Sequence, residues 1–134
     1  MTMTNKQIVR RFSDEVWGQG NLTAADEVLA VDLVEHNPLP GQGAGREGHK
    51  QVVTLFRSAF PDLRVTTEDL VEDGDRVALR WKAEGTHRGE LMGIAPTGRR
   101  VTLTGIEIVR ISAGKIVERW AEDNGPMVLQ QLRS

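Results

Sequence analysis

With 134 residues, the chain is long enough for one substantial hydrophobic core but too short for two, so we expect a single domain over residues 1–134. Its 17 basic and 19 acidic residues nearly balance along the chain, which excludes the one-signed charge field that binding to nucleic acid or an anionic membrane requires. Without cysteine there is no disulfide or thiolate nucleophile, and without an apolar leader or a run of about 18 apolar residues we expect a cytoplasmic protein.

Two helix signals open the chain. Thr4 followed by Gln7 is a capping-box pattern, and apolar residues then recur every four positions, which predicts a helix over residues 5–17. Thr23 is the expected cap of a second, shorter helix over residues 24–30.

A short strand and a third helix follow. Residues 31–36 alternate briefly, and residues 45–60 have the apolar stripe of an amphipathic helix. Phe56 lies on this stripe, and we expect it to contact a ligand. His49 is interpreted as lying off the stripe, and we expect it to be exposed.

The later half of the chain has the composition of β-strands, rich in Val, Ile, Thr and Trp. The predicted strands cover residues 63–72, 76–88, 99–111 and 115–124. Asp73-Gly74 and Ala113-Gly114 are hairpin turn signals. Helices at the front and a strand meander behind predict the α+β class, with an antiparallel or mixed sheet wrapped over the helices.

The segment between the second and third long strands, residues 89–98, is a loop with several apolar side chains, among them Met92. An apolar loop is costly in open water. Three interpretations stay open: it covers the mouth of a pocket, it contacts another subunit, or it packs locally.

Two segments combine apolar faces with groups that exchange protons. Trp81 and His87 share one face of a predicted strand, and Glu107 is the only ionisable residue among its same-parity neighbours. A carboxylate in such surroundings suits a general acid or base. The alternative is that Glu107 pairs with Arg80 or Arg119 on an exposed face.

His36 ends the early strand, where a hydrogen-bonded edge residue is more common than a catalyst. The three histidines lie on separate elements without metal-ligand spacing, so we expect no metal. Phosphate-loop, dinucleotide and serine-nucleophile motifs are also missing, which predicts proton transfer without a cofactor.

Several segments, in order along nearly the whole chain, carry a resemblance. They are Val9–Trp17 with Gly20-Asn21, Glu35-His36-Asn37-Pro38, Ala59–Leu63, Gly85–Gly89, Gly93–Arg99, Gly114–Glu118 and Leu129–Leu132. Together they resemble the SnoaL-like polyketide cyclase family. The resemblance implies an NTF2-like cone, with three helices on a strongly curved, mixed and mostly antiparallel sheet around a deep apolar cavity. It also implies a small apolar carbonyl compound as ligand, no cofactor, and a homodimer that associates through the sheet or the loop at residues 89–98.

Family members with known chemistry close a ring by intramolecular aldol condensation, in which a carboxylate removes a proton flanked by carbonyls. The family's typical end is His-Trp with Asp four residues after the Trp. Here Arg119 and Asn124 occupy the His and Asp positions around Trp120, and Asp123 comes one residue early. Because strand parity alternates, Asp123 reaches the cavity only if a bulge intervenes.

The resemblance implies a role for each candidate. Asp123 is the expected base, with Glu107 or His87 as substitutes. His87 and His36 would polarise carbonyl oxygens, and Asn124 would donate to the oxyanion.

The walls of the expected cavity are aromatic and apolar. Trp81 and Trp120 would hold the substrate rings, and Phe56 and Met92 would complete the binding surface.

Two other functions remain open. The same cavity suits a binding protein without catalysis, and a related variant would activate water for hydrolysis or hydration, or isomerise its substrate. An enzyme needs a base with access to the cavity, whereas a binding protein needs only shape and apolar lining. The direction of Asp123 and Glu107 therefore separates these functions.

Overall fold

The computed structural model describes residues 2–134. The chain begins with α1 (Asn5–Arg11), the π-helical segment η1 (Phe12–Trp17), α2 (Leu22–Val28), β1 (Leu29–Glu35) and α3 (Gly45–Ala59). Then come β2 (Arg64–Asp73), β3 (Arg76–Thr86), β4 (Arg100–Ser112), β5 (Lys115–Asp123) and α4 (Gly125–Arg133). The predicted strands agree with these bounds to within two residues.

The predicted first helix is present but changes its winding halfway. Thr4 Oγ1 accepts from the N–H of Gln7 at 3.1 Å, and the Gln7 side chain accepts from the N–H of Thr4 at 2.8 Å, so the capping box is confirmed. α1 then continues directly into the wider turns of η1. In α2 the cap is Asn21 rather than Thr23, because the Asn21 side chain accepts from the N–H of Ala24 at 3.0 Å.

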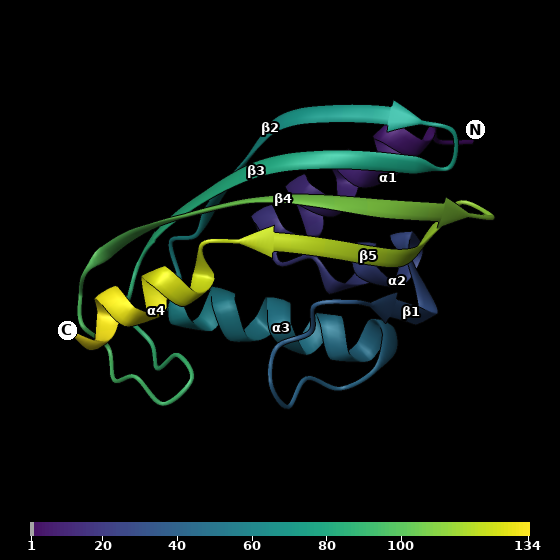
Figure 1. Cartoon of the computed structure of the whole chain (residues 1–134). Helices are drawn as coiled ribbons and strands as arrows, with labels where there is room; N and C mark the ends of the chain where they lie inside the picture. The colour runs from purple at the N-terminus through teal and green to yellow at the C-terminus, as the bar shows by residue number, and fades with distance from the viewer. Residues whose placement is uncertain (1) are drawn as a thin grey trace.

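The strands form one sheet in the order β1-β5-β4-β3-β2. β1 pairs with β5 in parallel, and the other three pairs are antiparallel. Figure 1 shows this sheet arching over α3, with α1 and α2 on the same side and α4 at one end of the strands. The predicted α+β class with a mixed, mostly antiparallel sheet is therefore confirmed.

The fourth helix, α4, was missing from the sequence-based prediction. Pro126 stands at its start, and Val128 and Leu132, four residues apart, are its buried residues. This spacing places both side chains on the face that packs against the second of two hydrophobic clusters.

The two clusters divide the core along the sheet. One lies under α1, η1 and α2 and includes Phe12, and the other lies around Phe60, α4 and the loop at residues 89–98. Trp17 and Trp81 pack against both clusters, so they stand at the boundary between them. None of the helices within residues 2–134 is long and apolar enough to cross a lipid bilayer.

Candidate active site

A cavity of about 440 Å³ extends along the concave face of the sheet. Its walls come from η1, the end of β1 with residues 37–42, α3, the inner faces of β2 to β5, the loop at residues 89–98 and α4. Most of the lining is apolar, and the apolar members include Phe12, Val52, Phe60, Leu63, Val65, Leu79, Ala83, Leu91, Leu103, Val128 and Leu129. Such a chamber suits a small, flat organic molecule.

The strand register arranges the polar wall residues in rows across the sheet. Trp81 lies opposite Gly105, and Gly105 lies opposite Asp123. In the next row, Glu107 lies opposite Ala121. Diagonal neighbours on one face of an antiparallel pair are about 7–8 Å apart, so the carboxylates of Glu107 and Asp123 share one stretch of wall.

A bulge in β5 decides which of its side chains face the cavity. Ile116 pairs with Ile111 and Glu118 with Arg110, so β5 has one extra residue, Val117, between these pairs. Ile116 is buried on the inner face before the bulge, and Arg119, Ala121 and Asp123 line the cavity after it. The bulge lies before Trp120, so it turns Asp123 toward the cavity but leaves Trp120 on the opposite face.

Gly105 leaves the space that Trp81 fills. A Cβ atom at residue 105 would lie 2.5 Å from Cζ2 of the Trp81 indole and 3.0 Å from Cβ of Asp123. The absence of a side chain therefore lets the indole lie across β4, next to the aspartate.

His49 and Glu35 form the inner, polar end of the cavity. The Trp17 indole N–H, which can only donate, lies 3.1 Å from Nε2 of His49. Nε2 must therefore accept, and the proton of the neutral ring resides on Nδ1, 2.5 Å from Oε1 of Glu35. Burial lowers the pKa of His49 against the opposing effect of Glu35, which agrees with a neutral imidazole.

Glu35 is held in its charged form. Burial alone would raise its pKa, but the hydrogen bond from His49 and the charge of Arg119 outweigh this and lower it to about 2. Nη1 of Arg119 donates to Oε1 of Glu35 at 2.6 Å, and the Gln42 amide donates to Oε2.

Arg119 joins this end of the cavity to Glu107. Both Nε, at 2.8 Å, and Nη2 of Arg119 donate to Oε2 of Glu107, a residue only 4% exposed. Burial alone would lower the pKa of Arg119, but the two carboxylates, Glu107 first, raise it. Of the two partners considered for Glu107, Arg119 is the one used, and the pair lies in the cavity wall rather than on an exposed face.

The structure brings together five of the predicted site residues. Trp81, Phe56, Met92, Glu107 and Asp123 all line the cavity. The loop at residues 89–98 contributes to this wall, since Met92 lines it and its neighbour Leu91 is buried.

Two predicted residues lie on the opposite face of the sheet. Trp120 comes after the bulge and points to the outer face of the sheet. Its ring stacks on that of His36, with 4.7 Å between the ring centroids, and the Arg76 guanidinium lies over the indole. His36 pairs with Glu118 at 2.7 Å. The prediction that Trp120 and His36 face the cavity is corrected: the bulge reverses the parity of β5 at Trp120, and His36 directly follows Glu35, which itself points into the cavity.

Two further predicted site residues, His87 and Asn124, form contacts outside the cavity. His87 is fully buried, accepts from the N–H of Thr97 at 3.2 Å and packs against Phe60, outside the cavity lining. The side-chain amide of Asn124 is bonded to the backbone of β4 on both sides: Oδ1 accepts from the N–H of Thr104 and Nδ2 donates to the carbonyl of Thr102. Neither side chain is placed to polarise a carbonyl in the cavity.

Sequence reasoning missed Glu35 and misplaced His49. The prediction that His49 is exposed was wrong: it is 1% exposed. It lies seven residues before Phe56, which is two helical turns, so it belongs to the same face of α3. Glu35 shares the strand face of the buried Leu33, which was the available signal.

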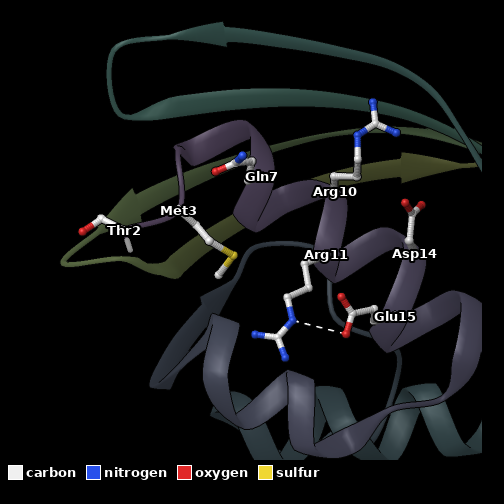
Figure 2. Close-up of a pocket in the computed structure, with 7 residues that line it drawn as sticks. All are labelled: Thr2, Met3, Gln7, Arg10, Arg11, Asp14 and Glu15. Carbon is white, nitrogen blue, oxygen red and sulfur yellow. Dashed lines mark hydrogen bonds and ion pairs between the residues drawn. The ribbon is translucent and has the colours of Figure 1, made fainter.

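A second hollow of similar volume lies on the surface of α1 and η1. Figure 2 shows it bordered by charged side chains, with Arg11 paired to Glu15 at 3.3 Å. Arg11 also pairs with Glu27, so these charges are satisfied by one another. Within residues 2–134 no group of three His, Asp or Glu side chains has a metal-binding arrangement. The cavity under the sheet is therefore the candidate site.

Comparison with known proteins gives one family. The profile of the SnoaL-like polyketide cyclases matches residues 7–132. A curated relative, the aklanonic acid methyl ester cyclase DnrD of Streptomyces peucetius, is 34% identical over 91 residues. This match covers 67% of the chain and 61% of the relative, so it spans less than two thirds of that protein's length.

Solved structures agree in fold. IdmH from Streptomyces antibioticus, a proposed polyketide cyclase, superposes with a TM-score of 0.83 at 33% identity, covering 98% of this chain and 100% of IdmH. A proposed SnoaL-like polyketide cyclase from Jannaschia sp. CCS1 superposes with a TM-score of 0.85 at 22% identity, covering 97% and 92% of the two chains. The predicted NTF2-like cone is confirmed.

The low pKa of Glu35 predicts a specific loss of stability in acid. A carboxyl whose folded pKa of about 2 lies below its ordinary value of 4.5 stabilises the fold above pH 4.5, and this stabilisation is lost as the pH falls toward 2. Urea unfolding of the wild type and Glu35→Gln should therefore differ most near pH 7. The difference should narrow by about 1 kcal/mol by pH 3.5. Glu68→Gln, which removes an exposed carboxylate, is the control, and a difference that stays constant with pH contradicts the prediction.

The contact at Gly105 predicts a second effect. Gly105→Ala should displace the Trp81 indole and destabilise the fold by about 1–3 kcal/mol through overpacking. Near-UV circular dichroism and urea unfolding measure both effects. Thr104→Ala, at the exposed neighbouring residue, should leave the spectrum unchanged. An unaltered tryptophan spectrum in Gly105→Ala would show that the indole does not depend on this gap.

Proposed function

Since the chain belongs to the SnoaL-like polyketide cyclase family, we propose that it is a cofactor-independent cyclase acting on a small apolar carbonyl compound by general acid–base chemistry. The observation that carries this proposal is the carboxylate of Asp123 on the cavity wall, next to the indole of Trp81. Shape and apolar lining alone would serve a binding protein, but a carboxylate facing the cavity is what an enzyme additionally needs.

Asp123 has one oxygen held and one available. Its Oδ1 accepts from the N–H of Gly125 at 2.7 Å, which fixes the direction of the carboxylate at the junction of β5 and α4. Within residues 2–134, Oδ2 has no hydrogen-bond partner in the structure. An oriented carboxylate with a free oxygen is suited to accept a proton from carbon.

The proposed reaction is an intramolecular aldol closure. Asp123 removes a proton from a carbon flanked by carbonyl groups, and the C–H electron pair becomes that of the enolate. The enolate carbon then forms a C–C bond to a second carbonyl carbon, whose C=O π bond breaks, and the resulting alkoxide takes up a proton. Trp81 and Phe56 would hold the flat substrate so that the two carbons meet.

Glu107 is the weaker candidate for the base, because Arg119 donates twice to one of its oxygens and commits the carboxylate to this ion pair. His87 is weaker still, since its ring lies outside the cavity lining. The second candidate function is a binding protein for the same ligand class, with Asp123 serving only to accept the N–H of Gly125 at the start of α4.

Replacement of Asp123 separates these two functions. With aklanonic acid methyl ester as the probe, named after the substrate of the curated relative, the wild type should give a cyclised isomer of equal mass. Asp123→Asn should lower the turnover number about 10²–10⁴-fold with the fold intact, as removal of a general base does. Incorporation of solvent deuterium measures proton removal from carbon, and chromatography with mass detection measures formation of the cyclised product.

Glu122→Gln, the neighbouring carboxylate on the outer face, is the matched control and should retain activity. Binding of the probe to the wild type without turnover or deuterium incorporation would favour the binding protein. Full activity in Asp123→Asn would exclude the aspartate as base.

We also propose that the chain forms a homodimer through the outer face of the sheet. Ile106 and Ile108 of β4 are 55% and 41% exposed there. Arg80 of β3 lies on one side of Ile106 and Glu122 of β5 on the other. A two-fold axis along β4 would therefore set the basic strand of one copy against the acidic strand of its partner.

The alternative dimer surface, the loop at residues 89–98, already uses Leu91 and Met92 in the cavity wall and the core. Ile106→Glu should convert the dimer to a monomer in sedimentation equilibrium at micromolar concentrations, because it buries a charge at the centre of the interface. Thr54→Glu, on the exposed side of α3, controls for the added charge. A wild-type protein that sediments as a monomer would end this proposal.

A further inference from the structure

The inner end of the cavity has one more negative than positive charge. Glu35 and Glu107 are both ion-paired to Arg119, at 2.6 Å in the case of Glu35. His49 does not add a positive charge, because its Nε2 accepts from the Trp17 indole N–H. A buried cluster with an excess negative charge favours any group that donates a hydrogen bond to it.

One oxygen of this cluster faces the cavity without a partner. Both hydrogen bonds from Arg119 end on Oε2 of Glu107, and within residues 2–134 none reaches Oε1. Oε1 is also not fully enclosed by protein: among the described residues, the buried side-chain nitrogen and oxygen atoms without a hydrogen bond are Nε of Arg46 and Nε2 of His87, and Oε1 of Glu107 is not one of them. Glu107 thus presents a free acceptor to the cavity that it lines.

Glu107 lies where it would meet one end of a substrate whose reacting carbon is at Asp123. Glu107 lies one row further toward the inner end than the row of Trp81, Gly105 and Asp123. A flat molecule lying against Trp81 with a reacting carbon at Asp123 would therefore extend one end toward Glu107, about 7–8 Å away on the sheet. The opposite end of the cavity is apolar, with Leu103 and Phe60 among its residues.

We propose that Glu107 is a specificity-determining residue that accepts, through Oε1, a hydrogen bond from a phenolic or enolic hydroxyl group of the substrate. This inference rests on the proposed function, since it defines the class of cyclase substrate: an aromatic compound with a hydroxyl at the end that lies against Glu107. A hydroxyl donates to a carboxylate without the dehydration cost of an ammonium group, and its ring suits the aromatic walls. An ether or carbonyl oxygen at the same place can only accept a hydrogen bond, so its lone pairs would be repelled by those of the carboxylate.

Binding of small aromatic probes tests this proposal without any turnover. Isothermal titration calorimetry at pH 7 with 2-naphthol, 2-methoxynaphthalene and 2-naphthylmethylamine compares a hydroxyl, an ether and an ammonium on the same ring. The wild type should bind 2-naphthol about 10- to 100-fold more tightly than the ether, the range expected of a hydrogen bond to a charged acceptor. Equal affinities, tighter binding of the amine, or no binding of 2-naphthol would overturn the proposal.

Two matched variants identify the acceptor. In Glu107→Gln the amide oxygen should remain with Arg119 and the NH₂ group should face the cavity, so the preference for the hydroxyl should be lost or reversed. Glu35→Gln removes the other carboxylate partner of Arg119 but leaves Oε1 of Glu107 in place, and it should keep the preference. A preference that survives Glu107→Gln, or disappears equally in both variants, would show that Glu107 is only a structural partner of Arg119.

The variant Asp123→Asn makes the two proposals distinguishable. It should lose turnover but keep the preference for 2-naphthol, because the acceptor is intact. If Asp123→Asn loses the preference and Glu107→Gln keeps it, the hydroxyl binds to the aspartate, and the inference about Glu107 is wrong while the proposed function stands. Where Glu107→Gln does not fold, equal affinities in the wild type still overturn the proposal, and a preference that survives in both Asp123→Asn and Glu35→Gln assigns the acceptor to Glu107.

Discussion

The extra residue in β5 is the constraint on which the site depends. With Val117 inserted into the pairing with β4, the strand turns Arg119, Ala121 and Asp123 toward the cavity and Trp120 toward the outer face. A regular strand would do the reverse, because side chains alternate with every residue. The bulge therefore delivers both the arginine that organises the inner end and the aspartate beside Trp81.

Arg119 brings a buried charge into a largely apolar chamber, which is costly unless partners surround it. Glu107 from the adjacent strand and Glu35 from the parallel neighbour β1 supply these partners. The chain Trp17–His49–Glu35 then fixes the second carboxylate from the helical side. Residues from both halves of the sequence thus meet at the guanidinium of Arg119. These contacts hold α3 against the inner face of the sheet.

Sequence patterns predicted those parts of the site that depend on uninterrupted periodicity. The pairing of β3 with β4 is continuous, so alternation placed Trp81 on the inner face, and the turns of α3 placed Phe56 there. Alternation failed for Trp120, because a bulge is set by tertiary packing and leaves no mark in the residue pattern. The pairing of Glu35 with Arg119, 84 positions apart, likewise follows from strand order and not from local sequence.

The position of Asp123 at the junction of β5 and α4 joins two properties that are separate in many pockets. Gly125 holds the carboxylate through its N–H, and the same helix supplies Val128 and Leu129 to the chamber wall. One short helix therefore both shapes this end of the chamber and sets the direction of the carboxylate.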